Sequence, residues 1–400
     1  MRVRHVWRKM QRMFKTTLSV VLLAAAVPAY AHHGTGTFEL NKTVSYPNAK
    51  LTKLELINPH SWLYFETTEA DGKVQKHRCE MRSAHVLRRS GWTPDLFPTG
   101  ARMDITASPD RADVASCYLQ TILFANGNRM DRYGQYVKAP AGGLKEVRGA
   151  IRTAGKRDAR RPTGEPNLAG DWAPEQVVMA DPRGVGGGLV PLSTIASVDP
   201  GARRGGGAGA GRGRGAATGP RLYGGTELTP QGEAEAAKFT QQDNPRFKCE
   251  TTSILFDWTF DGPVNRITQS RDTIGIQYGQ MELKRTVHMN QKTHPANIKP
   301  SRAGHSIGRW EGDTLVVDTV GFLPGVLNAP VRHSDKLHVI ERFTLDPATM
   351  LLTRQYEAED PVYLKGKYTG QDRIQPADAA YTDDKCNEQG FIDYSKQVNR

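Results

Sequence analysis

The chain has 400 residues and a formal net charge of +12 at pH 7. Since a domain takes about 100–200 residues, this length allows two domains with hydrophobic cores besides export and linker segments. Six basic residues precede residue 32, and several more lie in one glycine-rich stretch, so the folded parts are near neutral. The overall charge therefore gives little support to a nucleic-acid partner.

The first 31 residues are predicted to be a secretory signal peptide. Six basic residues lead into an apolar run from Leu18 to Val27, and Ala29-Tyr30-Ala31 has the small-x-small pattern of a cleavage site. The apolar run is too short to span a bilayer permanently. We therefore expect a periplasmic or secreted protein that keeps no stable membrane span after the signal is removed.

The four cysteines divide evenly along the chain. Cys79 and Cys117 precede the glycine-rich stretch, and Cys249 and Cys386 follow it. In an oxidising compartment this division predicts one disulfide in each domain. The spacings are far from C-x-x-C, so neither a zinc site nor a thioredoxin-like redox pair is favoured.

Residues 32–135 have the pattern of a small β domain. The strand-like runs are residues 51–57, 62–65, 73–81, 102–107 and 116–124, and a short helix is expected at 84–89. Three strands, a helix and two strands is the order of an OB-like five-stranded barrel, in which the third and fifth strands are neighbours. This topology would place Cys79 beside Cys117. Such barrels often bind single-stranded nucleic acid, but export argues against that function here, and no nucleic acid is expected as a partner.

Residues 136–221 are predicted to be a disordered linker. Eleven glycines lie between residues 201 and 225, together with the run G-R-G-R-G, and this low-complexity composition cannot bury a core. Outside the cytoplasm, a solvated linker is favoured over an RNA-binding segment. The exception is Leu168–Trp172, L-A-G-D-W, which could be a detached first piece of the second domain.

Residues 222–400 are predicted to form an antiparallel β-barrel. A short helix follows Thr229-Pro230, and Glu311-Gly312-Asp313 joins two apolar runs into a β-hairpin. The other β-like runs are residues 264–270, 273–278, 281–289, 337–345, 350–356 and 363–374. Because short turns join neighbouring runs, antiparallel pairing is expected. A lipocalin-like up-and-down barrel is favoured, with a sandwich as the alternative.

Two parts of the chain resemble known exported families. The segment from His32 to about Arg129, with its A-H-H-G start, the N-P-H at residues 58–60 and the G-W at 91–92, resembles a bacterial domain family of unknown function. The segment from about Leu222 to Cys386 resembles a second uncharacterised family through G-H-S-I-G-R-W-E-G-D-T-L-V-V-D-T at residues 304–319. The resemblances imply an exported, soluble protein and carry no established reaction. The glycine-arginine insertion departs from both patterns.

Three classes of function remain open: a ligand-binding protein, a metal-binding protein and an enzyme. A small barrel can bind an apolar ligand in its interior or mouth. Several histidines lie in or beside loops, and they could supply acid/base groups that titrate near neutrality. The candidate ligand-binding residues are His294, His305, His333, Arg309 and Glu341. Arg309 and Glu341 are interpreted more simply as a structural ion pair.

The sequence contains no nucleophile elbow at a strand-to-helix turn, no H-E-x-x-H and no phosphate loop. An accessory protein that binds a small molecule or a metal is therefore favoured over a catalyst.

A copper site is a further hypothesis. Cleavage after Ala31 leaves His32 first, so its α-amine and imidazole could chelate one ion together, with His33 or His60 as a third nitrogen. Cu(II) favours such planar nitrogen sets. The arrangement resembles the histidine brace of copper monooxygenases and periplasmic copper carriers. The alternative is a frayed terminus with two solvated histidines.

Overall fold

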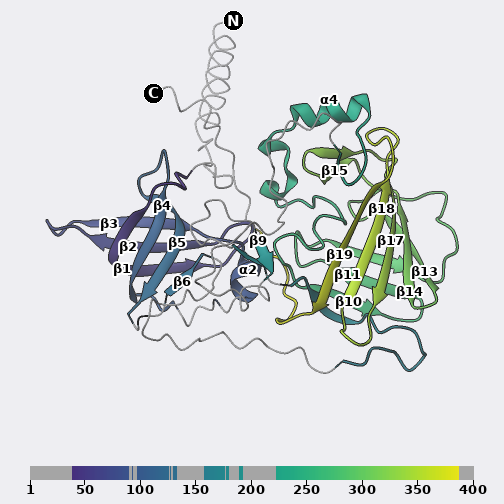
Figure 1. Cartoon of the computed structure of the whole chain (residues 1–400), viewed down its shortest axis with the longest axis horizontal. Helices are drawn as coiled ribbons and strands as arrows, with labels where there is room; N and C mark the ends of the chain where they lie inside the picture. The colour runs from purple at the N-terminus through teal and green to yellow at the C-terminus, as the bar shows by residue number, and fades with distance from the viewer. Residues whose placement is uncertain are drawn as a thin grey trace, which may run out of the picture. The chain divides into compact units, whose positions relative to one another are not determined.

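The computed structural model describes residues 38–89, 92, 97–125, 127, 129–132, 157–175, 177–179, 189–191 and 222–386. These residues form two β-barrels (Figure 1). The predicted signal peptide, His32, His33 and the G-R-G-R-G run lie outside the described residues. No helix within the described ranges is long and apolar enough to cross a membrane.

The first barrel has the OB-like strand order that the sequence predicts. Its strands are β1 (Val44–Glu55), β2 (Trp62–Thr68), β3 (Val74–Glu80), β4 (Arg102–Pro109) and β5 (Ser116–Phe124). Strand β1 pairs with β2 and β4, and the parallel pair β3–β5 closes the sheet. Helix α2 (Ala84–Arg89) lies between β3 and β4 in the chain, and β6 (Arg129–Asp131) pairs antiparallel with β5. Alternate residues such as Leu63 and Phe65 point inward and are almost fully buried.

Both predicted disulfides are confirmed. Cys79 and Cys117 are register partners on β3 and β5 and are bonded to each other. Cys249 and Cys386 are bonded across a sequence separation of 137 residues, so this bond ties the beginning of the second barrel to the segment that follows its last strand.

The second barrel has nine strands. In spatial order they are β10 (Asn265–Gln269), β11 (Thr273–Gln277), β12 (Lys284–His288), β13 (His305–Glu311), β14 (Thr314–Val320), β17 (His338–Leu345), β18 (Leu352–Glu359), β19 (Tyr368–Pro376) and β7 (Gly170–Ala173). All neighbours are antiparallel except β12 and β13, which are parallel because residues 289–304 cross back between them. Strand β7 pairs with both β10 and β19, which confirms that L-A-G-D-W belongs to this domain.

Short elements surround the strands of the second barrel. Helix α4 (Pro230–Lys238) begins after Thr229, whose side chain accepts a hydrogen bond from the Gly232 amide as an N-cap. Two 3-10 helices follow, η3 (Gln241–Asp243) and η4 (Pro245–Lys248). Strands β15 (Gly325–Asn328) and β16 (Val331–His333) form a separate hairpin, as do β8 (Val177–Met179) and β9 (Leu189–Pro191). Gly312 has φ of 59° at the tip of the predicted β13–β14 hairpin.

Residues 251–262, which we call the plug, pack against the inward-facing residues of the second barrel. Ile254, Leu255 and Trp258 belong to the same buried cluster as the inward-facing residues of the strands. The Trp258 ring meets the rings of Tyr278 and Phe343 edge-on, with centroids 5.4 and 6.0 Å apart. The interior is thus largely packed, whereas a lipocalin-like barrel would hold an open ligand cavity.

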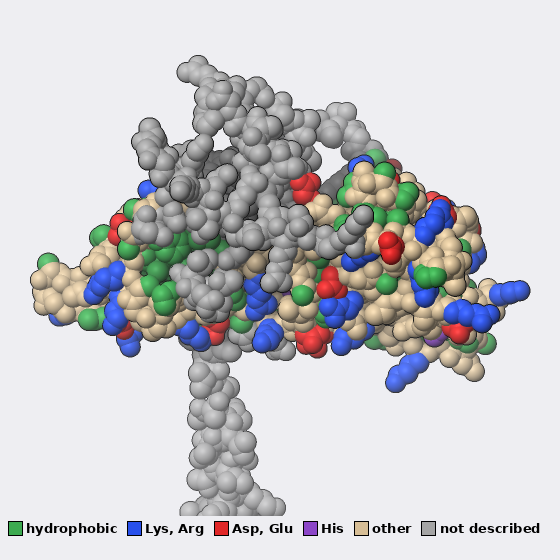
Figure 2. Space-filling model, turned by 90° about the horizontal axis from the view of Figure 1, so that it is seen from below, with side chains coloured by type: hydrophobic (Ala, Val, Ile, Leu, Met, Phe, Trp, Pro, Cys, Tyr) green, Lys and Arg blue, Asp and Glu red, His purple; other side chains and the backbone are tan. Residues whose placement is uncertain are grey.

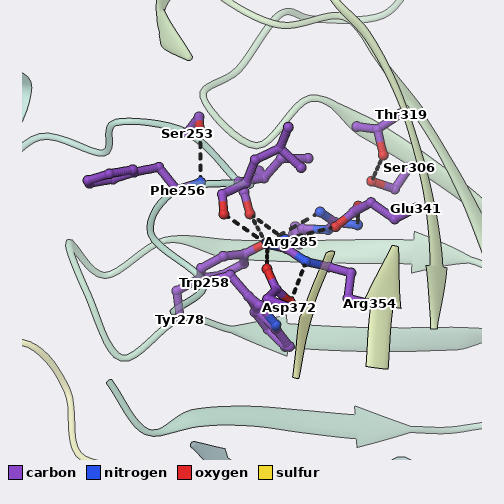
Figure 3. Close-up of polar contacts among 12 residues, drawn as sticks. Ser253, Phe256, Trp258, Tyr278, Arg285, Ser306, Thr319, Glu341, Arg354 and Asp372 are labelled. Carbon is purple, nitrogen blue, oxygen red and sulfur yellow. Dashed lines mark hydrogen bonds and ion pairs between the residues drawn. The ribbon is translucent and has the colours of Figure 1, made fainter. Parts of the chain in front are cut away.

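Arg354 connects the plug to the barrel wall (Figure 3). Its guanidinium donates to the backbone carbonyls of Ile254 and Leu255 at 3.0 and 2.8 Å. It also lies 3.2 Å from a Glu341 oxygen and 2.5 Å from an Asp372 oxygen. Glu341 is bound on its other side by Arg285, at 2.5 Å. Two cations and two anions are therefore balanced inside the barrel.

The expected ion pair between Arg309 and Glu341 is wrong. Arg309 is exposed on β13 and pairs with Glu311 at 2.6 Å. Glu341 is fully buried on β17, and β14 separates the two strands. Because side chains alternate across a strand, Arg309 faces outward while Glu341 faces the interior.

The described surface carries mixed charge. On the face in Figure 2, lysine and arginine side chains are interspersed with aspartate and glutamate. This distribution agrees with the near-neutral charge expected for the folded parts.

We predict that Arg354→Met destabilises the protein by about 3–5 kcal/mol, because the Asp372 carboxylate and the Leu255 carbonyl lose the guanidinium that binds them. Urea unfolding monitored by tryptophan fluorescence measures this change. The matched control is Arg342→Met on the outer face of β17, where only a surface pair with Glu311 is lost, a change of at most about 1 kcal/mol. Equal effects of the two substitutions would contradict the structural role of Arg354.

A second prediction concerns Asp257 in the plug. Its carboxylate is buried and accepts from the Thr252 amide at 2.8 Å. Burial raises the pKa of Asp257 to about 7, against the opposing effect of Arg246. A carboxyl whose pKa is higher in the folded state contributes stability that is present at acid pH and is lost as the pH rises toward 7.

The stability of Asp257→Asn relative to the wild type should therefore rise by about 3 kcal/mol between pH 5 and pH 8. Urea unfolding at the two pH values measures the difference. Asp335→Asn, at a surface position paired with Lys336, serves as the control. A difference between Asp257→Asn and wild type that does not change with pH would show that Asp257 is ionised in the folded protein throughout.

Candidate functional site

Four histidines and one aspartate gather on the outer face of the second barrel. We call His288, His294, His305, His338 and Asp318 the histidine cluster. His288 ends β12, His305 begins β13, and His338 begins β17. Asp318 lies near the end of β14, between β13 and β17. His294 comes from the crossing segment 289–304, so the parallel β12–β13 pairing brings the cluster together.

Strand alternation explains why these side chains face outward. On β13, Ser306 is buried and its neighbour His305 is half-buried; on β14, Thr319 is buried and its neighbour Asp318 is 26% exposed. Ser306 and Thr319 share an inward-facing hydrogen bond of 2.9 Å (Figure 3). The neighbouring residues His305 and Asp318 therefore point away from the core.

Asp318 organises the histidine cluster. Its Oδ1 atom lies 2.9 Å from His338 Nε2 and 3.2 Å from His294 Nε2. The other ring nitrogen of His294, Nδ1, lies 2.9 Å from His305 Nδ1. The His305 ring also stacks on His288, with centroids 5.0 Å apart. One oxygen of Asp318 thus orients the imidazoles of His338 and His294, and the His294 imidazole in turn contacts that of His305.

These contacts define a tautomer. A carboxylate oxygen accepts hydrogen bonds, so the proton of a neutral His294 lies on Nε2, toward Asp318. The lone pair of His294 Nδ1 then points at His305. His305 then donates from Nδ1 to make the 2.9 Å contact. A cation could replace that single proton, because both nitrogens would then present lone pairs to it.

The pKa values of Asp318, His305 and His338 in the histidine cluster are shifted in different directions. The hydrogen bond from His338 lowers the pKa of Asp318, with a smaller lowering by His294 and an opposing effect of burial. The same hydrogen bond raises the pKa of His338. Burial, followed by the charges of His288 and His294, lowers the pKa of His305. His305 is therefore neutral near pH 7, as a metal ligand must be.

Only two of the five predicted ligand-site residues meet. His294 and His305 are in contact, but His333 on β16 is buried beside Phe322, with its Nδ1 3.1 Å from the Ser334 carbonyl. Arg309 pairs with Glu311 on the surface, and Glu341 pairs with Arg285 and Arg354 in the interior.

Sequence reasoning missed one member of the cluster, Asp318, and favoured a structural role for two others, His288 and His338. The signal for Asp318 was present in L-V-V-D-T, where the aspartate falls on the solvent-facing phase of an apolar strand. The two histidines were assigned to strands, and this is correct, but both stand at strand ends.

The residues of the predicted copper site are only partly within the structure. His32 and His33 lie outside the described residues. His60 Nδ1 lies 2.9 Å from Oε1 of the buried Glu80, so one of its two nitrogens already has a partner. The copper site stays a prediction.

The described part of the chain contains no group of three or more His, Cys, Asp or Glu side chains placed to hold a metal ion. In the histidine cluster, only His294 Nδ1 and His305 Nδ1 converge on one point, because Asp318 contacts the opposite nitrogen of His294. The cluster offers two nitrogen ligands and an orienting carboxylate.

Comparison with known proteins bears on the first barrel. Residues 20–117 match the model of a family described as a family of unknown function, DUF6152. No curated protein and no solved structure matches the chain. The resemblance of the N-terminal segment to a family of unknown function is thereby confirmed, and the resemblance of the second segment remains a prediction.

Proposed function

We propose that this protein is an exported accessory protein that binds a divalent transition-metal ion at the histidine cluster. The observation that carries the proposal is the pair of imidazole nitrogens, His294 Nδ1 and His305 Nδ1, 2.9 Å apart. Two disulfides support export to an oxidising compartment.

The nitrogen separation favours one class of ion. Two nitrogens at about 2.05 Å from a metal are about 2.9 Å apart at a 90° angle and about 3.4 Å apart in a tetrahedron. Square-planar or tetragonal nitrogen sites are typical of Cu(II) and Ni(II). His288 stacks on His305 and could supply a third nitrogen by side-chain rotation, with water in the remaining positions.

Asp318 would act as an orienting residue. A carboxylate that accepts the proton of a ligating imidazole fixes its tautomer and raises its basicity. His338 shares the same oxygen at 2.9 Å and so keeps the carboxylate in place. An enzyme remains the alternative, in which the cluster would move protons, but no nucleophile adjoins the cluster in the contacts described above.

The test is calorimetric titration with Ni(II) of protein that carries one extra residue before His32, so that a terminal chelate cannot form. We expect one ion per chain for the wild type. His305→Gln should weaken binding at least about tenfold, and Asp318→Asn about 10–100-fold. His77→Gln, in the first barrel, is the matched control and should bind as the wild type does. If His305→Gln and His77→Gln bind equally well, the site is not the histidine cluster.

The N-terminal copper hypothesis is tested separately. Protein processed after Ala31 should bind Cu(II) more tightly than protein with one extra N-terminal residue, because only the free α-amine of His32 can chelate with its imidazole. Competition with a colorimetric Cu(II) chelator measures the two affinities. Equal affinities would remove the N-terminal site and leave the histidine cluster as the proposal.

A further inference from the structure

A pocket lies beside the plug in the second barrel. It has a volume of about 230 Å³ and lies between the plug and strands β18 and β19. The plug contributes Leu255, Phe256 and Phe260 to its lining, and the wall contributes Tyr356, Tyr368 and Asp372. Tyr356 has the inward strand phase of Leu352 and Ala358, which are core residues, whereas the exposed Gln371 lines the same pocket, so the pocket opens from the barrel wall to the surface.

Aromatic rings line the pocket from two sides. Phe256 and Phe260 stack on each other with centroids 4.4 Å apart. Tyr356 and Tyr368 lie on the facing wall, nearly parallel, with centroids 6.3 Å apart. The faces of these rings are partly covered: Arg246 lies 3.8 Å over the Phe260 ring, Arg354 lies 5.0 Å over the Tyr356 ring, and Tyr368 packs against Gly224. A flat guest would therefore meet these rings mainly edge-on.

A glycine shapes the pocket wall. Gly370 is directly opposite Tyr356 in the β18–β19 register, and a Cβ atom there would collide with the Tyr356 hydroxyl. The absence of a side chain at Gly370 therefore allows the tyrosine ring to lie flat against the wall. Any larger residue would push this ring into the pocket.

The polar groups of the pocket carry no uncompensated charge. Asp372 is bound by Arg354 through both carboxylate oxygens, at 3.2 and 2.5 Å. Asn328 donates from Nδ2 to the Tyr368 hydroxyl at 3.1 Å, which leaves its Oδ1 as an acceptor beside the pocket. An ionic guest would enter without a counter-charge, and burying an unpaired charge is strongly unfavourable. A neutral guest with a hydroxyl group meets no such penalty.

We propose that this pocket is a binding site for a small, neutral, planar aromatic molecule that carries a hydroxyl group. The guest ring would pack mainly edge-on against Phe256, Phe260, Tyr356 and Tyr368, and its hydroxyl would donate to Asn328 or Asp372. The proposal is independent of metal binding, because no residue of the histidine cluster lines the pocket.

The test uses 4-fluorophenol as the probe and fluorine NMR line broadening on the whole processed protein. We expect saturable binding, with cyclohexanol competing at least about tenfold more weakly, because it lacks the flat face. The charged analogues 4-fluorobenzoate and 4-fluorobenzylamine should also bind at least about tenfold more weakly. These comparisons need no variant protein, so they do not depend on the folding of a mutant.

Thr259→Phe tests the location, since Thr259 lines the pocket and a phenyl group there would fill it. Its affinity for 4-fluorophenol should fall at least about tenfold. Thr344→Phe, at an exposed position on the outside of β17, is the matched control and should bind normally. Equal binding by the two variants, equal binding of the charged analogues, or no binding to the wild type would each overturn the proposal.

Discussion

The second barrel depends on the guanidinium of Arg354. A nine-stranded barrel has an interior wider than its wall residues fill, and here the chain fills it with its own plug. Backbone carbonyls of the plug would be unpaired in an apolar interior. Arg354 satisfies two of them, and Glu341 and Asp372 balance its charge. The plug thus lies in one position, and the pocket beside it keeps a defined shape.

Much of the fold could be predicted from local signals. The order of strands and helix in residues 32–135 specified an OB-like barrel, and the even division of the cysteines gave both disulfides. The isolated L-A-G-D-W run was recognised as a possible piece of the second domain, although residues 136–221 as a whole were predicted to be linker. The plug was missed, because residues 251–262 have no strand alternation and no helical period, and the residues that bind this segment, such as Arg354, Tyr278 and Asn265, are distant in sequence or on other strands.

Only part of the candidate site could be predicted, again because contacts between residues distant in sequence decide the rest. Histidines in loops are visible in a sequence, and His294 and His305 were found in this way. Which of them meet depends on strand order: the parallel β12–β13 pair brings His288 beside His305, while β16 places His333 in a buried position elsewhere. Asp318 and Thr319 are consecutive on β14, and because side chains alternate along a strand, Asp318 faces outward while Thr319 is buried. Spacing along the chain does not contain this information.

The position of β7 shows that the glycine-rich stretch does not simply link the two barrels. Since β7 precedes that stretch and closes the sheet against β10 and β19, the stretch joins two parts of one barrel. Neither disulfide spans it, because Cys79–Cys117 lies wholly before it and Cys249–Cys386 wholly after it. A protease that cut there would produce two polypeptides held together only by β-sheet hydrogen bonds and packing. Such a nicked molecule would migrate as one species under native conditions and as two under denaturing conditions, even without a reducing agent.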